Sequence, residues 1–70
     1  MKTTIKKFNS LIEHLQNKFD NMEETFWDRS DNWQESDKGQ EFEDKMNCID
    51  NAINELQLII DELETEFNLN

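Results

Sequence analysis

Two runs of apolar residues, each spaced alternately by three and four positions, constrain this chain more than any other feature of its sequence. The first run lies at Ile5, Phe8, Ile12, Leu15, Phe19, Met22 and Phe26, and continues through Arg29 to Trp33. The second run lies at Phe42, Met46, Ile49, Ile53, Leu56, Ile60, Leu63 and Phe67. Such a spacing averages 3.5 residues, the repeat of a coiled-coil seam. It predicts an all-α chain with two helices that pack along their seams.

A polar stretch from Ser30 to Gln40 separates the two runs. Continuing the first repeat through this stretch would bring polar residues into the seam and leave Phe42 out of phase. The stretch contains Gly39, the one glycine, and Ser36 is suited to cap a following helix. We therefore expect an antiparallel two-helix coiled-coil hairpin, with a helix over about residues 3–32, a tip at 33–36 and a second helix over about 37–68.

Folding the chain between Asp37 and Lys38 predicts which seam residues face each other. The expected pairs are Trp33–Phe42, Arg29–Met46, Phe26–Ile49, Met22–Ile53, Phe19–Leu56, Leu15–Ile60, Ile12–Leu63 and Phe8–Phe67. The residues of the hairpin tip are then Arg29, Trp33, Ser36, Gly39 and Phe42. Arg29 has two interpretations: it locks the tip by pairing with Glu35 or Glu41 or by stacking on Trp33, or it contacts a partner.

The net charge of −10 is unevenly distributed along the chain. Residues 1–18 carry +3, residues 19–44 carry −8 and residues 45–70 carry −5. A nucleic-acid backbone would be repelled by most of this surface. Binding of nucleic acid through Lys2, Lys6 and Lys7 is disfavoured as well, because Glu62, Glu64 and Glu66 are expected beside these lysines. Direct nucleic-acid binding is therefore not expected.

The single cysteine and the short apolar runs indicate the compartment of the protein. Cys48 is the single cysteine, which suits a reducing compartment, and no apolar run approaches the ~20 residues of a membrane span. We expect a cytoplasmic protein that does not enter a membrane.

The sequence has no recognisable catalytic or metal-binding motif. His14 has no metal-ligand spacing around it, Cys48 has no neighbouring base, and the acids from Asp28 to Glu41 do not follow a calcium-loop pattern. We expect no enzyme activity, no cofactor and no metal.

The segment RSDNWQESDKGQEFEDK, from Arg29 to Lys45, carries a motif. It resembles small bacterial and phage-encoded helical proteins that read Arg-Ser-x-x-Trp-Gln-Glu-Ser-x-Lys-Gly-x-x-Tyr. The matching residues are Arg29, Ser30, Trp33, Gln34, Glu35, Ser36, Lys38 and Gly39, with Phe42 in the place of the tyrosine. The resemblance covers about a quarter of the chain and implies a phage or mobile-element origin, and hence the host cytoplasm, but no particular activity.

The residues that flank the seams divide the hairpin into two unlike edges. One edge is polar throughout and carries Asn9, Gln16, Glu23, Ser30, Glu43, Asp50, Gln57 and Glu64. The other carries Leu11, Lys18, Thr25, Ala52 and Ile59, with Cys48 nearby. A lone hairpin would leave Leu11, Ala52 and Ile59 in water, so we expect them to form the interface of a homodimer, a four-helix bundle. The alternative is that these are scattered surface residues without a partner.

The remaining feature is Trp27, which lies outside the seam among acidic residues. Exposed tryptophans are frequent interface anchors, although Trp27 could instead fold down onto the partner helix. The first hypothesis is a phage or mobile-element inhibitor whose acidic half occupies a basic, nucleic-acid-binding face of a target protein, an anti-CRISPR-like or other anti-defence role. Its expected contact residues are Glu23, Glu24, Trp27, Asp28 and Asp31. The alternative is a structural module that self-associates or joins a virion or another coiled-coil complex.

Overall fold

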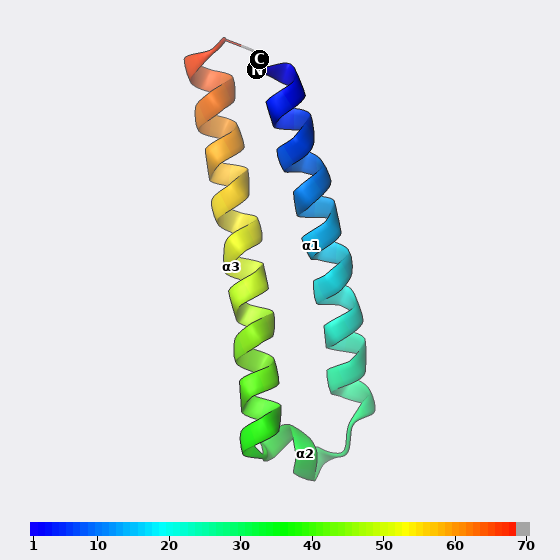
Figure 1. Cartoon of the computed structure of the whole chain (residues 1–70). Helices are drawn as coiled ribbons and strands as arrows, with labels where there is room; N and C mark the ends of the chain where they lie inside the picture. The colour runs from blue at the N-terminus through cyan, green and yellow to red at the C-terminus, as the bar shows by residue number, and fades with distance from the viewer. Residues whose placement is uncertain (69–70) are drawn as a thin grey trace.

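The structure, a computed structural model, describes residues 1–68 and contains three helices: α1 (Lys2–Asp28), α2 (Asp31–Glu35) and α3 (Asp37–Glu66). Figure 1 shows α1 and α3 side by side and running in opposite directions, with α2 at the end where the chain turns. The principal extents of the molecule are 51 × 15 × 13 Å, so it is a rod. The predicted all-α class is confirmed: the described part of the chain has no strand.

The first long helix ends four residues earlier than predicted. Its last residue is Asp28, and Arg29 and Ser30 follow with extended backbone angles. The reason is that Ser30 starts a new helix: its Oγ accepts a hydrogen bond from the backbone N–H of Trp33 at 3.3 Å. Serine favours this capping position over a helix interior. The last two residues of the predicted first helix and the first three of the predicted tip therefore form the separate five-residue helix α2.

The pairing of α1 with α3 differs from the predicted pairing by one heptad. The Phe26 ring stacks on the Phe42 ring, with 6.3 Å between the centroids and 17° between the planes. The prediction had placed Phe26 opposite Ile49, seven residues further along. Met22 lines the same hollow as Phe42, which agrees with the shifted register. Because the tip takes up all the residues between Asp28 and Asp37, the two arms are related about Gln34 and not about Asp37 and Lys38.

The burial of the two outer ends of the rod follows the shifted register. If Phe26 lies opposite Phe42, stepping outward by equal numbers of residues along α1 and α3 places Ile5 opposite Leu63. Ile5 is only 9% exposed, as this pairing requires. In the predicted register Ile5 would have extended past the second seam. Phe67, which was predicted to pair with Phe8, is 53% exposed. The predicted pairing of Arg29 with Met46 is also wrong, because Arg29 is exposed and Met46 belongs to the buried set.

The core of the rod is thin. Its buried apolar side chains are Ile5, Phe26, Met46, Ile53 and Ile60. Most other seam residues, such as Leu15 and Leu56, are only half-buried, and no large side chain of residues 1–68 is fully buried. Two helices can cover each other on one side only, so the seam stays open along its flanks.

Candidate functional site

The tip is held together by hydrogen bonds from α2 and its two capping serines. Ser36 is at once the last residue of the α2 turn and the N-cap of α3: its Oγ accepts from the backbone N–H of Gly39 at 3.2 Å and donates to the carbonyl oxygen of Trp33. Gln34 reaches back to α1, where its Nε2 donates to the carbonyl oxygens of Phe26 at 3.0 Å and Arg29 at 3.1 Å. The Phe26 carbonyl also accepts from the backbone N–H of Arg29 at 3.2 Å, so the Gln34 amide is a second donor to it at the end of α1. The three segments are thereby connected.

An aromatic cluster packs beneath α2. Trp33 lies edge-on to Phe26, with centroids 6.0 Å apart, and edge-on to Phe42 at 5.6 Å. The guanidinium carbon of Arg29 lies 5.1 Å from the centre of the Trp33 ring, close enough for a cation–π interaction. Of the two interpretations of Arg29, this geometry matches stacking on Trp33. The residue is nevertheless exposed, so the cation covers the outside of the cluster.

Gly39 lies where the tip turn and α3 approach each other most closely. It is buried, and a Cβ atom at this position would overlap the carbonyl oxygen of Trp33 and lie 2.5 Å from that of Gln34. Contacts below 3.0 Å from a Cβ to backbone atoms require the backbone to move. Only glycine therefore fits here, for reasons of space and not of backbone angle.

The structure thus gives most residues of the Arg29–Phe42 motif a role in building the tip. Two of these roles were not predicted: the cap formed by Ser30 and the bridge formed by Gln34. The signal for the first was present, because Ser30-Asp31 repeats the Ser36-Asp37 pair that predicted the start of the second helix. No comparable signal marks Gln34, whose acceptors are set by the path of the chain.

The predicted partner-binding residues gather at the end of α1 and the start of α2. We call Glu23, Glu24, Trp27, Asp28 and Asp31 the acidic patch; all five are exposed. Trp27 is 67% exposed, and its ring lies at 86° to that of its neighbour Phe26, with centroids 5.4 Å apart. Glu23 and Glu24 precede it by one helical turn and so flank it on the surface of α1. The alternative in which Trp27 folds onto the other helix does not occur.

One carboxylate of the acidic patch, Asp28, stands where negative charge is unfavourable for the helix. The last turn of α1 holds no basic residue and ends in Asp28. The carboxyl end of a helix carries a partial negative charge, so acids near it cost about 0.3–1 kcal/mol. Helix stability therefore does not account for Asp28, whereas Asp31 in the first turn of α2 is favourably placed.

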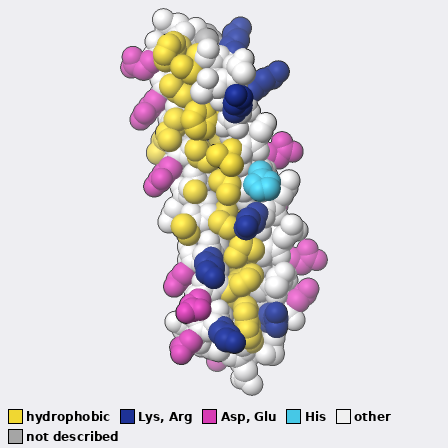
Figure 2. Space-filling view, viewed as in Figure 1, with side chains coloured by type: hydrophobic (Ala, Val, Ile, Leu, Met, Phe, Trp, Pro, Cys, Tyr) yellow, Lys and Arg dark blue, Asp and Glu magenta, His cyan; other side chains and the backbone are white. Residues whose placement is uncertain are grey.

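The second candidate surface is the edge formed by Leu11, Lys18, Thr25, Ala52 and Ile59, which we call the open face. Leu11 is 44% exposed and Ile59 is 40% exposed, Ala52 is half-buried, and the Cys48 thiol nearby is exposed. Figure 2 shows an apolar stripe along the length of the rod between the two helices, with basic side chains beside it and acidic side chains at its outer edges. The apolar side chains of the seam and of its flank are therefore continuous on this side.

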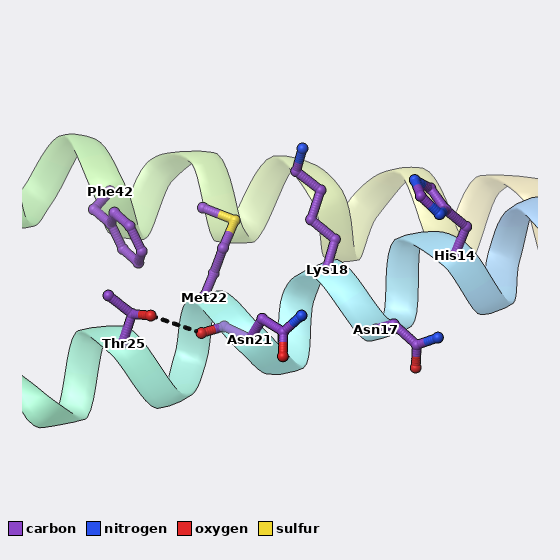
Figure 3. A pocket seen from close by; sticks show the side chains of 7 residues that line it. All are labelled: His14, Asn17, Lys18, Asn21, Met22, Thr25 and Phe42. Carbon is purple, nitrogen blue, oxygen red and sulfur yellow. Dashed lines mark hydrogen bonds between the residues drawn. The ribbon is translucent and has the colours of Figure 1, made fainter.

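A shallow hollow of about 430 Å³ lies on the same side, over α1. Figure 3 shows Met22 reaching from α1 toward α3, Phe42 above Thr25, and His14 and Lys18 extending over the groove. The Thr25 hydroxyl is occupied by a hydrogen bond to the carbonyl oxygen of Asn21 at 2.9 Å. Among residues 1–68, no group of three or more His, Cys, Asp or Glu side chains is placed to hold a metal ion. The groove therefore offers an apolar floor with two basic side chains at its rim.

Comparison with protein-family models, with curated proteins and with solved structures found no match to this chain. In the part of the chain that the structure describes, none of the helices is both long and apolar enough to cross a membrane.

Proposed function

We propose that this protein is a non-enzymatic binding module whose acidic patch docks on a basic surface of a partner protein. The observation that carries the proposal is the 67% exposure of Trp27 in the middle of four exposed carboxylates. Tryptophan is costly to leave in water and is enriched at the centre of interfaces. The carboxylates around it would select a basic partner and speed the encounter.

The tip supports this proposal by holding the acidic patch in place. Gln34 ties α2 to the end of α1, and the aromatic cluster of Phe26, Trp33 and Phe42 fills the space between the helices. Trp27 follows directly after Phe26 in the same helical turn. A preformed site loses less conformational entropy when it binds than a mobile one.

The specific role that we propose is occupation of a face that otherwise holds DNA or RNA. A basic, nucleic-acid-binding surface is the partner chemistry that a rod with a net charge of −10 fits best. The motif of residues 29–42 resembles that of phage-encoded proteins, and this resemblance supports an anti-defence role, such as inhibition of a CRISPR enzyme in the host cytoplasm.

The second candidate function is self-association as an antiparallel coiled-coil hairpin that forms a four-helix bundle. It is favoured by a separate observation, the exposure of Leu11 and Ile59 on the open face. The two functions are compatible, because the acidic patch and the open face use different residues. A homodimer could present acidic patches to another protein, or serve as an assembly component of a larger complex.

A binding experiment with matched charge changes tests the first function. We would immobilise the parent protein and three variants, expose them to lysate from the native host, and quantify the retained basic proteins by mass spectrometry. Glu23→Lys with Glu24→Lys, and Trp27→Ala alone, should each abolish retention of the partner. Glu13→Lys with Asp61→Lys makes the same change in net charge at exposed positions far from the tip and should retain it.

The pattern of losses decides between the explanations. Equal loss in both double variants would show that net charge and not a site drives the interaction. Retention by the Glu23→Lys/Glu24→Lys variant would contradict the proposal. Binding of the parent should also weaken between about 0.1 and 0.5 M salt, because the screening length falls from about 10 Å to a few ångströms.

A further inference from the structure

The open face has an apolar centre and, in the half away from the tip, two flanks of unlike charge. Lys7, His14 and Lys18 lie along the α1 flank, and Glu55 and Glu62 lie along the α3 flank, whose end nearest the tip carries Lys45; all six are exposed. We propose that the open face binds a second copy of this chain with both tips at the same end, so that the twofold axis runs along the rod. This inference rests on the self-association proposed above and goes further by assigning the orientation and the residue pairs.

The register of the two helices fixes which residues lie at the same height along the rod. Since Phe26 lies level with Phe42, residues whose numbers sum to about 68 are level with each other. Leu11 and Ile59 are nearly level by this rule, and both are about two-fifths exposed. A twofold axis along the rod packs α1 of one copy on α3 of the other. The exposed leucine of each copy then meets the exposed isoleucine of the other in one four-helix layer.

The charges on the flanks favour the same orientation. With the axis along the rod, Lys7 is level with Glu62 of the second copy, and His14 is level with Glu55 of the second copy. Each pair occurs twice by symmetry, so the contact is self-complementary. The opposite orientation, with the tips at opposite ends, would pack α1 on α1, bring His14 and Lys18 in the middle of one copy near the same residues of the other, and separate Lys7 from Glu62.

The positions of two surface hollows agree with this arrangement. The hollow over α1 runs from His14 to Thr25, and a second hollow of about 360 Å³ over α3 runs from Asp44 to Glu55. By the same rule these two hollows are level. The twofold axis along the rod places each hollow on its counterpart, and sets His14 and Lys18 at the rim of one level with Glu55 and Asn51 at the rim of the other.

The available area is adequate for such an interface. The face of the rod measures 51 by 15 Å, comparable to the ~800 Å² that each partner contributes to a standard protein interface. Covering this face would also close the seam that is half-exposed in the single chain. The dimer would present two acidic patches at one end, which suits a partner with two adjacent basic sites.

Two single charge reversals, tested apart and together, examine the residue pairs. In equilibrium sedimentation the parent should have twice the 8.5 kDa of the chain. Lys7→Glu alone and Glu62→Lys alone should each raise the dissociation constant of the dimer about tenfold, because two surface ion pairs become two like-charged contacts. An equimolar mixture of the two variants should dimerise as tightly as the parent, because the heterodimer restores both pairs. Both positions are exposed, and unchanged circular dichroism would show that the variants fold.

Spin labels at the tip examine the orientation. In a Cys48→Ser background, Lys38→Cys provides one label per chain, and double electron–electron resonance measures the distance between the labels of a dimer. With the tips at the same end, we expect about 30 Å or less between the labels. This is roughly the diagonal of a bundle of two by two helices, each ~10 Å wide. Tips at opposite ends predict about 45 Å or more at ~1.5 Å per helical residue.

The outcomes separate this inference from the proposals on which it rests. A dimeric parent, rescue in the mixture and the short distance support it. A parent that stays monomeric at several hundred micromolar overturns both the inference and self-association. A dimer without rescue, or with the long distance, overturns the orientation and leaves self-association standing. Docking of the acidic patch is decided independently by the Glu23, Glu24 and Trp27 variants.

Discussion

The side-chain amide of Gln34 lies 3.0 Å from the carbonyl oxygen of Phe26 and donates a hydrogen bond to it. The two residues are eight positions apart and belong to different helices. The same amide nitrogen also donates to the carbonyl oxygen of Arg29, so one side chain binds two carbonyls around the end of α1 and ties α2 to it. The direction of α2 in turn determines which part of α3 meets Phe26.

Replacing Gln34 by alanine should therefore loosen the tip. Each lost hydrogen bond is worth about 0.5–1.5 kcal/mol, so Gln34→Ala should lower the free energy of unfolding by about 1–3 kcal/mol. Urea denaturation followed by circular dichroism at one fixed protein concentration would measure the change. Gln57→Ala, at an exposed position of α3, is the control and should change stability little. Equal effects would show that the bridge is unimportant.

Gly39→Ala should destabilise the protein, although the position lies inside a helix. In an ordinary helix this change stabilises by about 0.5–1 kcal/mol. Here the new Cβ would overlap the backbone of Trp33 and Gln34, and overpacking costs about 1–3 kcal/mol. The melting temperature should fall, whereas Asn54→Ala on the exposed surface of α3 should not lower it. A higher melting temperature for Gly39→Ala would mean that the tip is less closely packed than described.

Ile5→Ala and Phe67→Ala together test the ends of the register. Ile5 is 9% exposed, and Ile5→Ala should lower the free energy of unfolding by about 2 kcal/mol. This is the lower end of the range for such a truncation, because the site lies near a helix end. Phe67 is 53% exposed, so Phe67→Ala should lower the free energy of unfolding by less, although the side chain removed is larger. Chemical denaturation of both variants would show the order. A larger loss for Phe67→Ala would favour the pairing of Phe67 with Phe8.

Reversing the charge of the acidic patch should improve folding while it removes binding. Lysines in place of Glu23 and Glu24 would turn the like-charged pairs with Asp20 and Asp28, three and four residues away on α1, into opposite-charged pairs, each worth about 0.2–0.5 kcal/mol at low salt. The melting temperature of that variant should rise, and the difference should shrink as salt is added. A variant that loses both stability and partner would indicate a fold defect and would not count in favour of the proposed site.

The sequence predicted the helical class and both seams, because the 3.5-residue repeat depends only on residue order. The register was not predictable from the same pattern. A shift of one heptad leaves every layer of the antiparallel seam matched, so Phe26 fits Phe42 as well as Ile49 by pattern alone. What distinguishes them is the space taken up by α2, and this depends on the Ser30 cap and the Gln34 bridge. The partner-binding and dimer residues could be placed on the surface, but their roles stay predictions.

The placement of the tip and the open face, and the proposed dimer, depend on the contact between Phe26 and Phe42. Nuclear Overhauser spectroscopy of labelled protein measures this contact directly, because cross-peaks report protons within about 5 Å of each other and ring centroids 6.3 Å apart bring edge protons within that range. We predict cross-peaks between the ring protons of Phe26 and those of Phe42, and none between Phe26 and the methyl groups of Ile49. Cross-peaks from Phe26 to Ile49 with none to Phe42 would contradict the register and the dimer geometry derived from it.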